Sequence, residues 1–357
     1  MNVRKNTKYA VACLSSMGLR ITPENRMAVH NSNRFLLQAT SAETNVLNVT
    51  SSLGPECLVM TRFVAGSPMA AFIKAQLRAR NIAYVGPDVP QGGPWGFRHQ
   101  FNIADSGFGL RAPRVWNDRA GEVGRTLDAK DYDTKKIFGK DGVAILHLSG
   151  LIAAMSPETT KACLALAKAA KKFGTLVSFD LNYRASFWKG REEELRGVFT
   201  DIASAADILI GNEEDFQLCL GVEGPSAGGK DLSSKTDAFL DMISRVRAQF
   251  PRAGLIATTL REVLDAETHL WGAIVSTNSA IHTIPPRQIR VLDRIGGGDG
   301  FVGGLLYGVL KGWDAGRCAQ FGWAAGALAV SLGTDYANPA DEEQIWSIWE
   351  GNARVSR

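Results

Sequence analysis

Long hydrophobic runs and blocks of like charge are missing from this sequence of 357 residues. Its most apolar late stretch, residues 321–332, is shorter than the roughly 20 residues that a helix needs to cross a bilayer. The apolar stretch at residues 9–14 is too short for the core of a signal peptide. The net charge is only +4, with 40 basic and 36 acidic residues. We therefore predict a cytoplasmic protein that binds neither membranes nor nucleic acid.

Cysteine is also scarce, with five residues and no Cys-x-x-Cys pair. An odd number of widely spaced cysteines does not fit a disulfide framework. We expect reduced, mostly buried thiols at these positions: Cys13, Cys57, Cys163, Cys219 and Cys318.

What the sequence does contain is an alternation of short apolar runs and helical patterns. Strands are predicted at residues 9–14, 56–62, 143–148, 175–181, 207–211 and 254–259. Helices are predicted at residues 43–52, 68–80, 156–172, 192–205, 235–250, 298–311, 316–331 and 341–350. Ser156 is expected to cap the helix that starts at Pro157. Near-continuous apolar strands separated by helices indicate an α/β fold with a mostly parallel sheet covered on both faces.

Two regions interrupt this alternation. Residues 19–38 and 95–116 lack a helical period and contain short extended segments with turns. We predict that together they form a small β-structured lid beside the main sheet. A polar stretch at residues 224–234 is predicted to be a surface loop.

The most informative motif is a glycine turn late in the chain. Residues 289–304 begin as a strand, tighten into Gly296-Gly297-Gly298-Asp299 and open a helix of small residues. Backbone N–H groups at a helix N-terminus have no partner in the helix and can bind phosphate oxygens, which glycine allows to approach closely. A carboxylate beside such an anion hole is placed to take a proton from a hydroxyl that attacks a γ-phosphate.

This turn has two other interpretations. It could be a plain strand-to-helix turn in which Asp299 only caps the helix. The pattern Gly298-x-Gly300-x-x-Gly303 also matches the dinucleotide-binding fingerprint. That fingerprint requires a second strand with an acidic residue about 20 positions further on, whereas the region that follows here is helical. The dinucleotide interpretation is therefore the less favoured one.

Further blocks stand in a fixed order along the chain. They lie at residues 117–121 (Asn-Asp-Arg-Ala-Gly), 147–150 (His-Leu-Ser-Gly), 177–184 (Val-Ser-Phe-Asp-Leu-Asn-Tyr-Arg), 211–215 (Gly-Asn-Glu-Glu-Asp), 258–262 (Thr-Thr-Leu-Arg-Glu) and 269–273 (His-Leu-Trp-Gly-Ala). With residues 293–299, this series resembles the ribokinase-like (phosphofructokinase-B) carbohydrate kinases, and most closely the 2-keto-3-deoxygluconate kinases. The resemblance runs from about residue 9 to the C-terminal helix. It implies one ribokinase-like three-layer α/β/α domain over residues 1–357, with a β lid.

The resemblance also implies roles for the residues of the acceptor site. Asp299 would be the general base of an ATP-dependent sugar kinase, with Gly296, Gly297 and Gly298 as its anion hole. Arg184 and Arg119 would face a sugar acid, because a guanidinium can bind a carboxylate through two parallel hydrogen bonds. Further contacts with the substrate are implied at Thr40, Ser41, Asn45, Arg98 and Asn117.

The nucleotide side follows from the same resemblance. Glu213 would order Mg²⁺ through water, as a hard oxygen ligand. Contacts with ATP are implied at Asn212, Thr259, Arg261, Gly296, Gly298 and Asn338. In this family lids often pair, so a homodimer through the lid is expected as well.

The sequence departs from the family pattern near its N-terminus. Where these kinases carry a glycine pair before the first core helix, this chain has Thr40-Ser41. The added side chains should narrow the sugar pocket. Three functions therefore stay open: a 2-keto-3-deoxygluconate kinase, another sugar kinase of the fructokinase or ribokinase type, and a catalytically weak paralogue that binds sugar and nucleotide.

Overall fold

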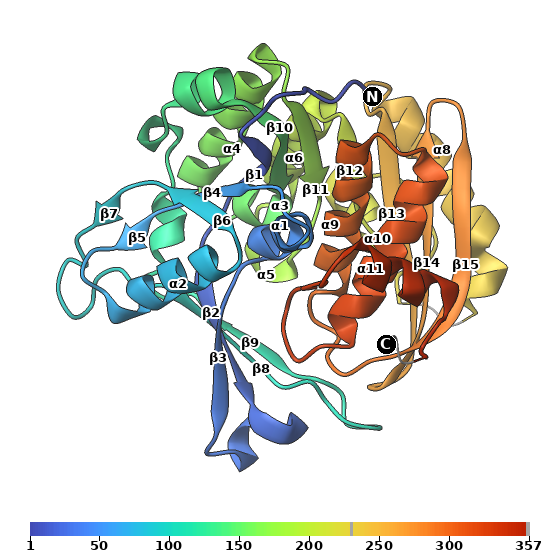
Figure 1. The fold of residues 1–357 in the computed structure, drawn as a ribbon, viewed down its shortest axis with the longest axis horizontal. Coiled ribbons are helices and arrows are strands. Elements are labelled where there is room, and N and C mark those ends of the chain that lie inside the picture. Colours follow the sequence, from blue (N-terminus) through green and yellow to red (C-terminus); the bar gives the residue numbers. More distant parts are fainter. Residues whose placement is uncertain (229–230, 355–357) are drawn as a thin grey trace.

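The computed structural model describes residues 1–228 and 231–354. Within them, a large sheet runs through the molecule with helices on both faces (Figure 1). From one edge to the other, the nine strands of this described sheet are β15 Ile281–Arg290, β14 Thr268–Thr277, β13 Leu255–Asp265, β12 Ile208–Ile210, β11 Leu176–Asp180, β10 Val143–Ser149, β1 Tyr9–Leu14, β4 Cys57–Met60 and β6 Ile82–Val85.

The strands from β13 to β6 pair in parallel, whereas β14 and β15 add an antiparallel edge. The predicted mostly parallel sheet is thus confirmed. The predicted strand at residues 254–259 is too short, because β13 continues to Asp265. The sequence did not indicate this continuation, since Arg261 and Glu262 end the apolar run. Both side chains line a cavity instead of packing in the core.

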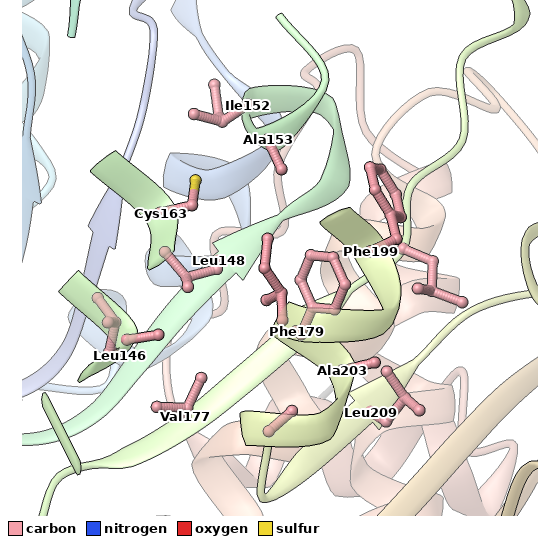
Figure 2. Packing of buried hydrophobic residues seen from close by; sticks show 14 of the residues in the cluster. Leu146, Leu148, Ile152, Ala153, Cys163, Val177, Phe179, Phe199, Ala203 and Leu209 are labelled. Atoms are coloured by element: carbon pink, nitrogen blue, oxygen red, sulfur yellow. The ribbon is translucent and has the colours of Figure 1, made fainter. Parts of the chain in front are cut away.

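Two hydrophobic cores form, one on each face of the sheet, because side chains alternate between the faces along a strand. In β10, Leu146 and Leu148 pack on one face and Ile145 on the other. Figure 2 shows the first core, in which Phe179 of β11 meets Phe199 edge to face, with ring centroids 5.5 Å apart.

The helices divide between the two cores. Residues of the first core come from α3 Gly150–Ala153, α4 Pro157–Lys172, α5 Ala185–Trp188, α6 Glu192–Ala205, α7 Glu213–Leu220 and α8 Thr236–Gln249. Residues of the second core come from α1 Ala42–Ser52, α2 Pro68–Ala79, α9 Gly297–Lys311, α10 Ala315–Val330 and α11 Glu342–Glu350. The predicted cap is present, since the Ser156 hydroxyl accepts a hydrogen bond from the Thr159 N–H and Pro157 is the first residue of α4.

The lid is a separate four-stranded sheet below the main sheet in Figure 1. In spatial order its strands are β3 Phe35–Thr40, β2 Gly18–Pro23, β8 Gln100–Ala104 and β9 Val115–Asp118. The predicted β lid is confirmed, with strands that reach one or two residues beyond the predicted segments. Two helical turns, η1 Glu24–Arg26 and η2 Val29–Asn31, connect β2 to β3.

The remaining elements are short. They are β5 Phe63–Val64, β7 Asp88–Val89, η3 Val123–Thr126, η4 Ala129–Asp131, η5 Lys135–Gly142 and η6 Leu232–Lys235. Residues 229–230 of the predicted loop at 224–234 lie outside the described residues. The five cysteines are buried and unpaired, as expected. A search of the described residues finds no helix that is both long and apolar enough to span a membrane.

Candidate active site

The glycine turn joins the end of β15 to the start of α9. Gly296 has φ 87°, and a Cβ atom there would lie 1.7 Å from the Asp335 carbonyl oxygen, so the backbone excludes every other residue type. Gly298 is exposed and borders the cavity, with open space where a Cβ atom would be. The free N–H groups of the first turn of α9 therefore face a space that an anion can enter.

Asp299 lies in the first turn of α9 and lines a cavity of about 700 Å³. Its Oδ2 accepts a hydrogen bond of 2.9 Å from Asn45 Nδ2, on α1. Burial raises the pKa of the Asp299 carboxyl to about 7; the charges of Glu43 and Asp335 add to the rise, while Asn45 and Arg184 oppose it. A carboxylate with this pKa can accept a proton near neutral pH and release it again.

The carboxyl ends of β11 and β12 also line the cavity. Asp180 ends β11, and burial together with the charges of Asp215 and Asp299 raises the pKa of its carboxyl well above the usual value. Asn212 caps α7, accepting from the Asp215 N–H while the Asp215 carboxylate accepts from the Asn212 N–H. Glu213 borders the cavity, and its Oε1 accepts from the Gly228 N–H at 3.2 Å.

Basic side chains line the cavity as well. They are Arg261 on β13 and Arg294 before the glycine turn, and neither side chain makes a hydrogen bond or direct ion pair with a described residue. Burial, with the nearby charge of Arg294, lowers the pKa of Arg261 to about 10. Burial and the two arginines lower the pKa of His269 to about 4, and its buried Nε2 has no described partner. The cavity thus contains two guanidinium groups whose N–H donors are available to an anion, although Glu213, Asp215 and Asp293 lie near enough to attract them.

The sequence of this chain matches a known family over ranges that include the glycine turn and the carboxyl ends of β11 and β12. Residues 130–250 and 271–341, more than half of the chain, match the profile described as pfkB family carbohydrate kinase. The chain belongs to this family.

Several relatives are named as kinases of ketodeoxy sugar acids. The chain is 28% identical over 213 residues to the 5-dehydro-2-deoxygluconokinase of Clostridium perfringens, a match that covers 60% of this chain and 56% of that protein. It is 22% identical over 342 residues to the 2-dehydro-3-deoxygalactonokinase of Haloferax volcanii, covering 95% and 96% of the two chains. The chain thus spans just over half the length of the first of these relatives and nearly all of the second.

Solved structures agree on the fold. The 2-dehydro-3-deoxygluconokinase of Thermotoga maritima superposes with a TM-score of 0.85 at 27% identity, over 96% of this chain and 98% of that one. A putative ribokinase II of E. coli, in complex with ATP and Mg²⁺, has a TM-score of 0.74 at 16% identity, over 96% and 99% of the chains. The ribokinase-like architecture, with its main sheet and small β lid, is therefore shared with structures of this kinase family.

The residues predicted from the sequence divide into two groups. Those that line the cavity are Asp299, Gly296, Gly298, Arg184, Asn212, Glu213, Thr259 and Arg261. Among the described residues, the lining does not include Gly297, Thr40, Ser41, Asn45, Arg98, Arg119, Asn117 or Asn338. Gly297 is buried within the turn, and Asn45 reaches the cavity only through Asp299.

The residues outside the cavity have other partners. Ser41 caps α1 by accepting from the Thr44 N–H at 3.1 Å. Arg98 pairs with Asp118 in the lid, and Asn117 is exposed on β9. Asn338 accepts a hydrogen bond from Ser52 at 2.8 Å, at the far end of α1.

Arg119 is already paired. Its Nη1 donates to both carboxylate oxygens of Glu122, at 2.7 and 2.9 Å, and the Glu122 side chain is fully buried. The Ser16 hydroxyl donates to the same carboxylate. The charge of Arg119 still acts on Glu43, whose carboxyl neighbours Asp299. Arg119 thus lies near Asp299, but its positive charge is already compensated by Glu122.

Sequence reasoning missed five side chains of this site: Asp180, Glu43, His269, Arg294 and Asp335. Asp180, His269 and Arg294 lie within the sequence blocks that resemble the family. These blocks could have pointed to the three residues, but the sequence analysis gave them no role. For Glu43 and Asp335 the charge effect on Asp299 depends on tertiary contacts, which the sequence does not display.

We predict that inorganic phosphate raises the Tm of the protein, because an anion that binds only the folded state stabilises it. Arg294→Gln should remove most of this rise, since it deletes one of the two guanidinium groups that line the cavity. Thermal unfolding at increasing phosphate concentration measures the effect. Arg252→Gln, at an exposed position, is the control; an equal rise in both variants would contradict the assignment of this anion site.

Proposed function

We propose that this protein transfers the γ-phosphate of ATP to a hydroxyl of a sugar acid, with 2-keto-3-deoxygluconate as acceptor and its 6-phosphate as product. One observation carries the proposal: Asp299 stands in the first turn of α9, beside an open glycine turn, with a pKa of about 7. The names of the similar proteins, which are kinases of ketodeoxy sugar acids, support this class of acceptor.

In the proposed reaction Asp299 takes the proton from the acceptor hydroxyl as that oxygen attacks the γ-phosphorus. The bond from the γ-phosphorus to the bridging oxygen breaks, and ADP leaves. The N–H groups of the glycine turn stabilise the charge on the transferred group, as pre-oriented donors do. Arg261 and Arg294 neutralise the charge of the polyphosphate.

The same cavity fits ATP with Mg²⁺. The described residues contain no cluster of three or more metal-binding side chains, which suits an ion held mainly by substrate phosphates. Glu213 would hold Mg²⁺ through water, since its carboxylate borders the cavity without an ion pair. Asn212, Thr259, Arg261 and the glycine turn would contact the phosphates. When bound, Mg²⁺ supplies neutralisation of charge on the transferred phosphoryl group.

The acceptor side favours Arg184 for recognition of a carboxylate. Arg184 is exposed at the cavity, and its one hydrogen bond to a described residue goes to the Tyr183 carbonyl oxygen at 2.7 Å. Its remaining N–H groups are free for a ligand. Arg119, in contrast, already has the buried Glu122 carboxylate as partner. If Arg184 did not bind the acceptor either, neither arginine would recognise a carboxylate. The pairing of Arg119 therefore supports a second candidate function, a kinase of neutral sugars.

The lid surface supports a homodimer. Its outer strands expose apolar side chains, the most exposed being Trp116 at 71% and Val115 at 49% on β9, with Phe35, Leu36 and Leu37 on β3 at 40–45%. Apolar surface of this kind marks protein interfaces. We propose that two copies of the chain associate through their lids.

Asp299→Asn should lower kcat by about 10²–10⁴-fold, because it removes the general base. The asparagine side chain has the same shape as the aspartate, so the cavity should keep its form. The Kd for ATP should therefore stay within about twofold. Turnover by ADP release and ATP binding by calorimetry measure the two effects. Unchanged turnover in this variant would rule out the proposed mechanism.

The pH profile of the unaltered protein completes this test. Only the ionised carboxylate can accept a proton, so kcat should fall about tenfold per unit as the pH drops below about 7. An acid limb near pH 4, the ordinary range of an aspartate, would show that a different environment surrounds the base.

Arg184→Ala should raise the KM for a sugar acid by about 10- to 100-fold, the usual effect of losing a hydrogen bond between charged groups. The KM for a neutral sugar should stay the same, because it offers no carboxylate. Steady-state kinetics with both kinds of acceptor measure this. Equal sensitivity of both acceptors would argue against carboxylate recognition by Arg184 and for the second candidate.

Trp116→Asp should convert the proposed dimer into a monomer, because a charge placed in an apolar interface must be desolvated. Light scattering at micromolar concentration measures the molecular mass. Ile281→Asp is the matched control, since Ile281 is 48% exposed on β15, outside the lid. A monomer before any substitution would refute the lid interface.

A further inference from the structure

A buried ion pair cluster lies where the lid joins the main domain. Arg20 on β2 has a fully buried side chain and donates hydrogen bonds to Asp293 and to Asp335. Asp293 precedes the glycine turn and also accepts from the Ser106 hydroxyl at 2.7 Å. Asp335 follows α10, and its carbonyl oxygen lies against Gly296. The guanidinium therefore compensates two carboxylates that flank the anion hole.

Thr40 connects this cluster to the proposed base. Its Oγ1 lies 2.8 Å from Asp335 Oδ2 and 3.3 Å from Asn45 Oδ1. Asn45 in turn donates from Nδ2 to Asp299 Oδ2 at 2.9 Å. Thr40 and Asn45 are only 3% and 2% exposed, so water is excluded from these contacts. An unbroken chain of polar contacts thus runs from Arg20 through Asp335, Thr40 and Asn45 to Asp299.

The chemistry of these groups determines which of them donates each hydrogen bond. An ionised carboxylate only accepts, so Asn45 must present its NH₂ group to Asp299 and its carbonyl oxygen to Thr40. The Thr40 hydroxyl has one proton, which it shares between Asp335 and the Asn45 oxygen in a three-centre arrangement. Without that hydroxyl, the buried Asn45 oxygen would lose its donor, and the amide would lose the contact that orients it.

We propose that Thr40 is a positioning residue: its hydroxyl ties the Arg20–Asp335 ion pair to Asn45 and so holds Asn45 in the orientation that stabilises the ionised Asp299. The proposal rests on the proposed function, in which Asp299 is the base. It gives a role to the threonine that stands where the family resemblance expects a glycine. That role differs from the contact with the substrate that the resemblance implies for Thr40.

The charges around Asp299 determine the sign of the effect. Glu43 on α1, Asp335 after α10 and Asp180 at the end of β11 oppose its ionisation, as does burial. Arg184, after β11, and the hydrogen bond from Asn45 favour it. A weakened bond from Asn45 leaves Arg184 as the main favourable partner. The pKa of Asp299 should then rise, and the acid limb of kcat should move to higher pH.

The experiment compares Thr40→Val, which keeps the shape and deletes the hydroxyl, with Thr40→Ser, which restores it. Thr50→Val is the matched control, because Thr50 is fully buried on α1 and its hydroxyl has no described partner. The primary measurement is the titration of ¹³C-labelled aspartate carboxyls by NMR, with the Asp299 signal assigned by its loss in Asp299→Asn. The second is the pH profile of kcat.

We expect Thr40→Val to raise the pKa of Asp299 by about 0.7, which corresponds to one lost neutral hydrogen bond. At pH 7 kcat should fall about threefold, because the ionised fraction of Asp299 falls from about half to about one sixth, while the KM for ATP stays unchanged. Thr40→Ser should restore both values, and Thr50→Val should match the unaltered protein.

Equal Asp299 titrations in Thr40→Val and Thr50→Val would overturn the role of Thr40. The titration requires no turnover, so it also separates this inference from the proposed function. An unaltered protein that releases no ADP with any acceptor would contradict the proposed function, and the titration would still decide whether Thr40 supports Asp299.

Discussion

The contact between Arg20 and the carboxylates of Asp293 and Asp335 is the constraint on which the site depends. A buried guanidinium with two buried carboxylates is costly to separate, because each charge would be left without a partner in a low dielectric. The cluster therefore fixes the lid strand β2, the segment before the glycine turn and the segment after α10 relative to one another. Because the Asp335 carbonyl oxygen also fills the space beside Gly296, this arrangement leaves room for glycine alone at the turn.

The cavity beside this turn is lined by charges of both signs. Burial disfavours the charged forms of Arg261, Arg294 and His269, and Arg294 adds repulsion at Arg261 and His269. Burial also disfavours the ionisation of Asp180 and Asp299, whose charges repel each other. An entering polyphosphate would relieve the repulsion among the cations and would leave Asp299 beside the acceptor. The proposed binding of polyphosphate and the raised pKa of Asp299 thus have a common cause, which is the burial of charged groups in this cavity.

The glycine turn and Asp299 could be predicted from the sequence because the turn, the helix start and the carboxylate occupy four consecutive positions. The cap at Ser156 was predictable for the same reason, since capping acts within one helical turn. The bridge from Thr40 to Asp335 was not, because its partners are 295 residues apart and meet only in the folded chain. The predicted contact of Arg119 with the acceptor stays a prediction, and its pairing with Glu122 was not predicted, because the burial of Glu122 depends on the folded chain.

The central claim is that the protein phosphorylates a sugar acid in the cavity that Asp299 lines. A coupled assay of ADP release, run with ATP and Mg²⁺ over 2-keto-3-deoxygluconate, other ketodeoxy sugar acids, fructose and ribose, tests it most directly. The account predicts that a sugar acid supports the highest kcat/KM, with 2-keto-3-deoxygluconate first among the acceptors. Release of ADP with neutral sugars only, or with no acceptor at all although ATP binds, would contradict it.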